Sequence, residues 1–344
     1  MRAIVIPRHG PPDVFEERDV EERRLSPQDV RVRVEAAGVN FADVMGRVGL
    51  YPDAPPLPYA PGYEVAGVVE ETGDRVPPSL APGTRVVAVT RFGGYAERVR
   101  VPAYAVAPLP PSLPFPVAAA LPVSYLTAHL ALVHVGNARP GDRVLVHGGA
   151  GSVGLAVLDL ARPMGLELYA TAGSDEKCRL LEARGVVRAV NYQTTDYEVA
   201  LREATRQRGF HLVLDPLGPE SFAKGLRLLA PLGRIVCYGF SQLVTGPKRN
   251  LWHAVTTYLS KHKVNPVTLM NANAGVFGLN LAHLFDEREL VTRGLAELVA
   301  RAADGTVAPT IAATYPLSAA GAAAAHTCLH DRRNVGKLLL VRGA

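Results

Sequence analysis

The chain has 344 residues, of which 48% are hydrophobic and 20% are charged, so its composition is that of a globular protein and excludes a disordered one. The formal net charge of +5 comes from scattered basic residues, and it fits an anionic small-molecule cofactor at least as well as nucleic acid. The three dispersed cysteines, Cys178, Cys237 and Cys328, are too few for a disulfide framework.

The part of the chain before residue 122 is rich in predicted strands. Short β-rich runs, separated by turns that contain proline and glycine, lie at 3–6, 29–39, 64–73, 85–89 and 96–101. This pattern is typical of an antiparallel, barrel-like β domain. The last segment, 314–341, supplies a helix and a final strand that can return to this domain.

An uncharged stretch between Arg100 and Arg139 needs a separate explanation. It contains seven prolines, which exclude one continuous helix, and the part after Pro122 is too short to cross a bilayer of about 30 Å. The N-terminal sequence lacks the long apolar run of a signal peptide. We therefore expect a soluble, cytoplasmic protein.

The middle of the chain alternates between predicted strands and predicted helices. The strands lie at 143–147, 166–171, 188–192, 211–215, 234–239 and 274–281. Ser174 and Gly185 are suitable ends for the second helix, and a later helix is predicted through 226–233. This alternation predicts a parallel, doubly wound sheet. A further helix, predicted around 251–262, has no clear place in it.

A glycine motif stands between the strand at 143–147 and the helix that follows. Gly149, Gly151 and Gly154 have the spacing G-x-G-x-x-G, and Ser152 and Val153 begin the helix. One glycine makes a tight turn, the next admits the pyrophosphate, and the third lets helix and strand pack closely. Amide groups and the helix dipole then favour an anion. The motif alone is weak, but its strand–helix setting predicts a dinucleotide site.

The end of the second strand indicates which dinucleotide binds. An NAD site usually has an acid about 20 residues beyond the motif, where it holds the ribose 2′-hydroxyl. Here Gly173 and Ser174 stand at the strand end, and Lys177 follows one helical turn later. A hydroxyl and an ammonium bind a 2′-phosphate, which predicts NADPH. Two alternatives remain: a loop shift that presents Asp175, and a Lys177 that is only a solvated surface lysine.

Several segments together resemble one protein superfamily. Residues 38–52, 61–69, 126–132 and 147–154 read GVNFADVMGRVGLYP, PGYEVAGVV, LTAHLAL and HGGAGSVG, a combination that resembles the medium-chain dehydrogenases/reductases. GVNFAD and GLYP, with VLDPLG and GRIVCYG downstream, resemble its zinc-independent quinone oxidoreductases. PKRNL (247–251) and NVGKLLL (334–340) are similar to the branch around the vesicle amine transport protein 1 homologues.

The resemblance implies a fold of two parts. A GroES-like antiparallel β-barrel catalytic domain is expected over 1–121 and 283–344. A Rossmann domain with a doubly wound parallel sheet is expected over 122–282, which makes the chain an α/β protein.

Departures from the zinc-dependent relatives predict that no metal is bound. Those enzymes have a cysteine ligand where Asn40 stands, and Gly-His-Glu where this chain has Gly62-Tyr63-Glu64. They often also have a four-cysteine lobe, whereas no cysteine precedes Cys178 here, so neither site can be built. Tyr63 is expected to fill the space of the missing ligand.

The missing metal predicts the class of substrate. Zinc stabilises the alkoxide in an alcohol dehydrogenase, and without it the acceptor must already be electrophilic. A quinone or an α,β-unsaturated carbonyl meets this requirement, because hydride transfer then needs only hydrogen-bond donors for the developing oxyanion. We expect an NADPH-dependent quinone or enone reductase.

Three residues are candidates for the reaction itself. Asn40 stands where relatives have a metal ligand, and its amide can donate to substrate or cofactor. Tyr51 follows a turn that contains Gly49, and it is either a proton donor or an aromatic residue at the rim of the pocket. Asp43 is the third candidate, with the alternative that it lies on a helix face and only orients its neighbours.

The resemblance also implies further contacts to the cofactor. Thr127 would meet the nicotinamide carboxamide and Tyr192 the adenosine phosphate end, while Gly239, Phe277 and Gly278 would line the cleft. Asn334 and Lys337 would close on the cofactor from the C-terminal segment, with a surface charge at the end of a strand as the alternative for Lys337.

Two rival functions and one partner remain to be considered. The chain could be an enoyl-thioester reductase of the same fold, or a non-catalytic protein that binds NADPH or handles lipids.

We expect a small-molecule substrate, no nucleic acid and no membrane insertion. A homodimer is expected if 274–281 is an edge strand that pairs with its twin.

Overall fold

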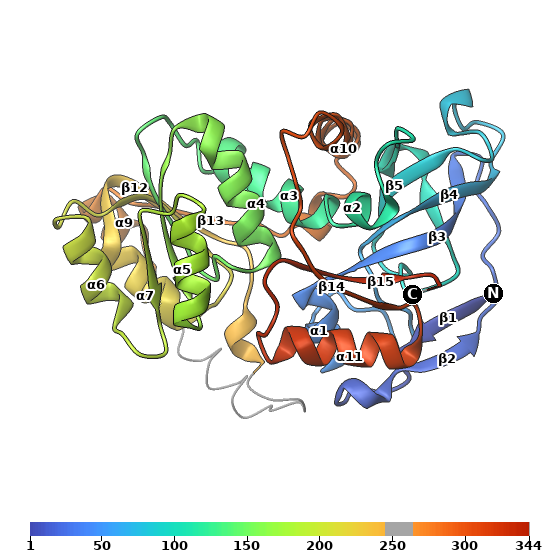
Figure 1. Cartoon of the computed structure of the whole chain (residues 1–344), viewed down its shortest axis with the longest axis horizontal. Coiled ribbons are helices and arrows are strands. Elements are labelled where there is room, and N and C mark those ends of the chain that lie inside the picture. The colour runs from blue at the N-terminus through green and yellow to red at the C-terminus, as the bar shows by residue number, and fades with distance from the viewer. Residues whose placement is uncertain (245–263, 344) are drawn as a thin grey trace. The chain divides into compact units, whose positions relative to one another are not determined.

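A computed structural model describes residues 1–244 and 264–343, and the chain divides into two compact units (Figure 1). Of the described residues, 1–126 and 282–343 belong to the first unit, and 127–244 and 264–281 belong to the second. The chain enters the second unit within helix α3 (Pro122–His129). The helix predicted around 251–262 and the motif at 247–251 lie outside the described residues.

The first unit is built on a seven-stranded, mainly antiparallel sheet with the order β14-β15-β3-β4-β5-β7, in which β6 also pairs with β3. Its strands are β3 (Asp29–Val39), β4 (Glu64–Thr72), β5 (Arg85–Val89), β6 (Arg98–Pro102), β7 (Val106–Pro108), β14 (Ile311–Pro316) and β15 (Lys337–Val341). The final strand β15 pairs antiparallel with β3, which confirms that the C-terminal segment returns to this domain. A separate two-stranded sheet joins β1 (Arg2–Val5) to β2 (Glu16–Asp19).

Alternation along β3 explains why this segment is a strand. Val30, Val32 and Val34 are fully buried, while Arg31 and Arg33 point to the other face, as the period of two requires. The apolar face therefore packs into the core and the charged face remains outside, where both arginines form ion pairs with glutamates.

Among its described residues, the first unit also contains helices α1 (Phe41–Arg47), α2 (Phe115–Ala119), α10 (Arg288–Ala303) and α11 (Ala319–His330), together with the start of α3. Small residues of α11, including Ala322 and Ala325, are fully buried, which lets this helix approach its neighbours closely. Helices α1 and α11 lie side by side (Figure 1).

The second unit contains a six-stranded parallel sheet with the order β10-β9-β8-β11-β12-β13. Counted along the chain, this is the order 3-2-1-4-5-6 of a Rossmann sheet, with the switch point between β8 and β11. The strands are β8 (Arg143–Val146), β9 (Glu167–Ala172), β10 (Arg188–Asn191), β11 (Phe210–Asp215), β12 (Leu229–Cys237) and β13 (Gly275–Gly278). The helices are α4 (Ser152–Ala161), α5 (Asp175–Ala183), α6 (Tyr197–Ala204), α7 (Pro219–Leu228) and α9 (Pro266–Ala272).

The strands predicted in the middle of the chain are present, and β13 is the edge strand. The helix predicted through 226–233 is wrong over its second half, because α7 ends at Leu228 and strand β12 begins at Leu229. Pro231 lacks the N–H that a helix needs, and Leu232 has a φ of +65°, which a helix cannot accommodate. Within 1–244 and 264–343, no helix is both long and apolar enough to cross a membrane.

Candidate functional site

In the second unit, the glycine motif forms a cradle between β8 and α4. A Cβ on Gly149 would lie only 2.8 Å from Cβ of Ala170, and a Cβ on Gly154 would overlap the carbonyl oxygen of Gly149. The motif is therefore needed for close packing of strand and helix, as predicted. The left-handed residue of the turn is Gly148, with a φ of +65°, which the motif itself does not include.

The N-terminus of α4 begins directly after this turn. Gly151 is the N-cap, and Ser152 and Val153 are the first two helical residues. The first amides of an α-helix have no acceptor within the helix, so they are available for a phosphate, and the helix dipole adds to the attraction. The residues present thus fit the pyrophosphate of a dinucleotide.

The next strand end carries the residues predicted to select the dinucleotide. Ser174 caps α5, and its Oγ accepts a hydrogen bond from the backbone N–H of Lys177 at 3.2 Å. The hydroxyl of Tyr192, which follows β10, lies 2.8 Å from the place of a Cβ on Gly173, so a larger residue there would require the tyrosine ring to shift. The structure brings Gly173, Ser174, Lys177 and Tyr192 together at the carboxyl ends of β9 and β10.

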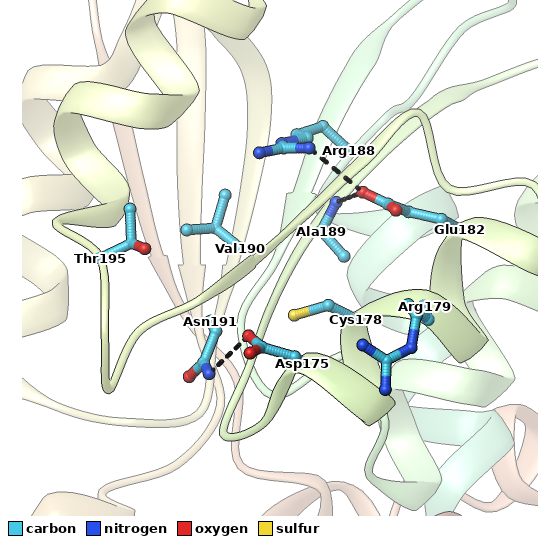
Figure 2. A pocket seen from close by; sticks show the side chains of 9 residues that line it. All are labelled: Asp175, Cys178, Arg179, Glu182, Arg188, Ala189, Val190, Asn191 and Thr195. Carbon is cyan, nitrogen blue, oxygen red and sulfur yellow. Dashed lines mark hydrogen bonds and ion pairs between the residues drawn. The ribbon is translucent and has the colours of Figure 1, made fainter.

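Asp175, the acid that a loop shift could present to the ribose 2′-hydroxyl, points instead to the neighbouring strand β10. The amide nitrogen of Asn191 donates to Oδ1 of Asp175 at 2.8 Å, and Figure 2 shows this bond at one end of a pocket between α5 and β10. The pocket has a volume of about 200 Å³ and also contains Cys178, Arg179 and Glu182. The bond fixes the carboxylate of Asp175 beside β10.

Three other predicted cofactor residues of this unit lie at the carboxyl ends of β12 and β13, and a fourth, Thr127, lies in a helix. Gly239 follows β12, and a Cβ there would come within 2.8 Å of the carbonyl oxygen of Pro216. Phe277 and Gly278 lie in β13, opposite the last two residues of β12. Thr127 is buried in α3. Because the strands are parallel, their carboxyl ends form one edge, where ligands bind in this fold.

In the first unit, a buried polar group joins three segments that are distant in sequence. Oδ1 of Asn40 accepts a hydrogen bond from Nζ of Lys337 at 2.7 Å, and Nδ2 of Asn40 donates to Oε1 of Glu64 at 2.9 Å. Lys337 and Glu64 also form an ion pair with each other. Their side chains are 2% and 0% exposed, so the interpretation of Lys337 as a surface charge is wrong.

Glu64 was missed by the sequence analysis, which considered it only as part of Gly-Tyr-Glu. Its second oxygen, Oε2, accepts a hydrogen bond from the backbone N–H of Val123 in α3 at 2.7 Å. A Cβ on Gly38 would clash with its Oε1, so this glycine makes room for the carboxylate. The available signal was a charged residue directly before the apolar run 65–69, since a charge that is buried with such a run needs a partner.

Asp43 is held by its neighbours in the core of the first unit. Its carboxylate accepts hydrogen bonds from the backbone N–H groups of Asn40 and Gly62, both at 2.9 Å, and from the hydroxyl of Tyr95 at 3.3 Å. Burial raises the pKa of Asp43 to about 7, against the opposing effect of the two backbone donors. The carboxylate orients the N-terminus of α1 and the loop at Gly62, which is the alternative role considered for it.

Tyr51 belongs to a group of aromatic rings. It follows Gly49, whose φ of +74° makes the predicted turn, and its ring packs edge-to-face on Tyr63 with centroids 6.1 Å apart. Tyr63 in turn lies 5.1 Å from the ring of Phe92. Burial, with Asp43 and Tyr51 nearby, raises the pKa of Tyr63 far above its ordinary value, so this hydroxyl stays protonated. Tyr51 is half-buried, whereas Tyr63 is buried.

Asn334 lies in the loop between α11 and β15, where its side-chain amide donates to the carbonyl of Gly336 at 2.8 Å. Contacts of Asn334 and Lys337 to a cofactor stay predictions. The first unit contains the amide of Asn40 between two charged groups. It also contains the phenol of Tyr51, which packs on Tyr63. Each of these groups can donate to an oxygen that gains negative charge.

Comparisons with known proteins give the family. The alcohol dehydrogenase GroES-like domain matches residues 26–111, and the family described as zinc-binding dehydrogenase matches residues 182–340. The chain is 42% identical to the rat synaptic vesicle membrane protein VAT-1 homolog over 92% of its own length and 78% of the relative. It is 34% identical to mouse quinone oxidoreductase over 99% of its own length and 98% of the relative.

Solved structures agree with these matches. The Escherichia coli quinone oxidoreductase complexed with NADPH has a TM-score of 0.87 at 28% identity, over 99% of this chain and 100% of that one. The human VAT-1 homolog-like protein has a TM-score of 0.84 at 28% identity, over 100% of this chain and 98% of that one. With a GroES-like β domain and a Rossmann sheet, the chain therefore belongs to the quinone oxidoreductase family of the medium-chain dehydrogenase/reductase superfamily, in the branch that includes the VAT-1 homologues.

Proposed function

We propose that this protein is an NADPH-dependent reductase that acts on quinones or α,β-unsaturated carbonyl compounds without a metal. The observation that carries the proposal is the end of strand β9, where Ser174 and Lys177 stand together and Asp175 is bonded to Asn191. The hydroxyl of Ser174 and the ammonium of Lys177 can bind a 2′-phosphate, whereas a carboxylate without a partner would repel it. The quinone oxidoreductase solved with NADPH supports the same cofactor.

The residues present fit each part of the cofactor. Gly149, Gly151 and Gly154, with the amides of Ser152 and Val153, would hold the pyrophosphate. Gly173, Ser174, Lys177 and Tyr192 would hold the adenosine end with its 2′-phosphate. Thr127, Gly239, Phe277, Gly278 and Asn334 are proposed to complete the contacts. When bound, NADPH supplies a hydride to the acceptor.

The chain's own residues would stabilise the reduced acceptor. A quinone or enone that takes up a hydride becomes an oxyanion, which needs hydrogen-bond donors and finally one proton. We propose that Tyr51 donates its hydroxyl hydrogen to this oxygen and that solvent returns the proton to the phenol. Asn40 donates an N–H to the same oxygen, and Asp43 holds the backbone of Asn40 in place.

Two observations support a reaction without metal. Asn40 and Tyr63 stand where zinc-dependent relatives have ligands, and Asn40 is already bonded to Glu64 and Lys337. Within 1–244 and 264–343, no three His, Cys, Asp or Glu side chains lie together in a way that could hold a metal ion. Donors on the protein must then do the work that zinc does in an alcohol dehydrogenase.

The decisive experiment is steady-state NADPH oxidation by the purified protein with benzoquinone, phenanthrenequinone, an aliphatic enone and crotonyl-CoA. We expect turnover with the quinones or the enone, and faster turnover with NADPH than with NADH. Turnover with crotonyl-CoA alone would indicate an enoyl-thioester reductase. Tight NADPH binding without turnover on any acceptor would refute the enzymatic function and favour a non-catalytic role.

A homodimer is proposed for the assembly and the cytoplasm for the location. Strand β13 is the edge of the parallel sheet, and its Val276 and Phe277 are 38% and 45% exposed. An apolar edge strand of this kind can pair with a second copy across a two-fold axis. Light scattering of the wild type and of Val276→Lys tests this, since the substitution should yield monomers.

A further inference from the structure

We propose that Glu64 and Lys337 are positioning residues that hold the side-chain amide of Asn40 in one orientation, so that its remaining N–H is the group offered to an acceptor oxygen. The inference rests on the proposed function, because it explains how the donor in that reaction is oriented. It also gives Lys337 a role in the β domain, in place of the predicted contact to the cofactor.

The geometry leaves the amide little freedom. Asn40 is the N-cap of α1, Glu64 is the first residue of β4, and Lys337 is the first residue of β15. The amide oxygen is 2.7 Å from the ammonium and the amide nitrogen is 2.9 Å from the carboxylate. One of the two side-chain N–H bonds of Asn40 donates to Glu64. Because the amide group is planar, this hydrogen bond also sets the direction of the second N–H.

Charge determines which way the amide faces. A rotation of the amide by half a turn would place its NH₂ against the ammonium of Lys337 and its carbonyl against the carboxylate of Glu64. Two charge-assisted hydrogen bonds would be replaced by two repulsive contacts. Both charged side chains are almost completely buried, so water cannot screen these contacts. The nitrogen of Asn40 is thereby kept on the side of Glu64.

Stability alone does not explain why a buried ion pair occupies this place. Removing two charges from water costs several kcal/mol per ion, and an apolar pair of similar volume is often equally or more stable. Glu64 also accepts a hydrogen bond from the backbone N–H of Val123. This bond gives one reason for the buried carboxylate, but it gives none for the buried ammonium of Lys337. The contact that requires both charges is the one to the two ends of the Asn40 amide.

A fixed N–H suits the reaction better than a rotating amide. The oxygen of the acceptor gains negative charge during reduction, and a donor that is already aimed at it needs no reorganisation. If the amide could rotate, its carbonyl would face the oxyanion for part of the time and repel it. Loss of the charged pair should therefore lower kcat and leave NADPH binding unchanged.

The first measurement is made on the wild-type protein. In a sample labelled with ¹⁵N-asparagine, the side-chain signals of Asn40 are assigned by their loss in Asn40→Asp. We expect one Asn40 amide proton with a downfield shift and slow exchange, because it is bonded to a buried carboxylate. Two equivalent, rapidly exchanging protons would overturn the proposal. This result does not depend on turnover, so it separates the proposal from the proposed function.

The second measurement uses the double variant Glu64→Gln with Lys337→Met, which removes both charges at similar volume. We expect faster exchange of the Asn40 amide, a kcat about tenfold lower, and an unchanged Kd for NADPH measured by fluorescence. The matched control is Glu289→Gln with Arg293→Met, an exposed ion pair of α10, which should leave all three values unchanged. A folded double variant with wild-type exchange and kcat would overturn the proposal.

A third variant applies if the double variant does not fold. Gly38→Ala keeps both charges but forces Glu64 away from Asn40, because the new Cβ would clash with Oε1. We expect the same faster exchange and lower kcat. If the wild type proves inactive with every acceptor, the exchange data still decide whether the amide is fixed.

Discussion

The side-chain nitrogen of Asn191 lies 2.8 Å from Oδ1 of Asp175, and the hydrogen bond between them holds the acid beside strand β10. Asn191 is the last residue of that strand and is buried, whereas Asp175 is the exposed first residue of α5. At the end of the second Rossmann strand, an acid whose side chain can rotate towards the cofactor would bind a ribose 2′-hydroxyl and repel a 2′-phosphate. We therefore expect the side-chain amide of Asn191 to contribute to a preference for NADPH over NADH.

The variant Asn191→Ala should release Asp175. We expect the preference for NADPH over NADH, measured as the ratio of the two kcat/KM values, to fall about tenfold. The double variant Asn191→Ala with Asp175→Ala is the control, because it should recover the preference. An unchanged ratio in the single variant would show that Asp175 has no access to the ribose.

Lys177→Ala should weaken the binding of NADPH selectively. Removal of the ammonium should raise the KM for NADPH about tenfold and leave the KM for NADH nearly unchanged, because only NADPH has a 2′-phosphate. Arg179→Ala, which removes another cation of the same helix, is the matched control. If both cofactors were affected equally, Lys177 would not bind the 2′-phosphate.

Tyr51→Phe tests the proton donor. The variant keeps the ring that packs on Tyr63 but lacks the hydroxyl, so we expect kcat to fall about tenfold without a change in the KM for NADPH. Tyr59→Phe is the control for loss of a phenol, since its buried hydroxyl has no hydrogen-bond partner among the residues described. A wild-type kcat would leave Tyr51 with a role only in shaping the pocket.

Asp43 should make stability depend on pH. Its pKa is raised to about 7 in the folded protein, above its value in the unfolded chain, so the folded state binds the extra proton. The stability that this proton contributes is present below the unfolded pKa, and it is lost as pH rises through about 7.

Denaturant unfolding of the wild type and of Asp43→Asn measures this effect. Relative to the variant, the wild type should lose about 2 kcal/mol between about pH 5 and about pH 8. The comparison removes the contribution of other titrating groups, because they are common to both proteins. Parallel pH profiles would mean that Asp43 stays ionised in the folded state.

Metal removal tests the absence of zinc. We expect less than about 0.1 zinc per chain by mass spectrometry, compared with one or more in an enzyme that depends on zinc. Prolonged dialysis against a chelator should leave quinone turnover and thermal stability unchanged. A loss of activity that added zinc restores would refute the proposed reaction without metal.

Much of the Rossmann unit could be predicted from the sequence, since its signals are local. The glycines from Gly149 to Gly154 have their spacing because backbone and helix must meet there, and Ser174 stands at the start of α5 because its oxygen accepts from the helix amide. The prediction was wrong at 229–233, where Pro231 and the left-handed backbone of Leu232 end the helical pattern and strand β12 begins.

The candidate residues of the first unit were less predictable. Asn40 and Tyr51 could be named from their motifs, but their partners could not. Lys337 is 297 residues away from Asn40 and reaches it only because β15 returns to pair with β3. Nothing local in the sequence around Lys337 distinguishes a buried lysine from an exposed one.

The sequence by itself determined the alternation of strands and helices, the phosphate cradle and the family, because these depend on short spacings and on hydrophobic period. Only the tertiary structure decided that Asp175 is bonded to Asn191 and that Glu64 and Lys337 enclose the amide of Asn40. The physical reason is that a buried charge must find its partner in space, and sheet pairing rather than sequence distance brings that partner to it.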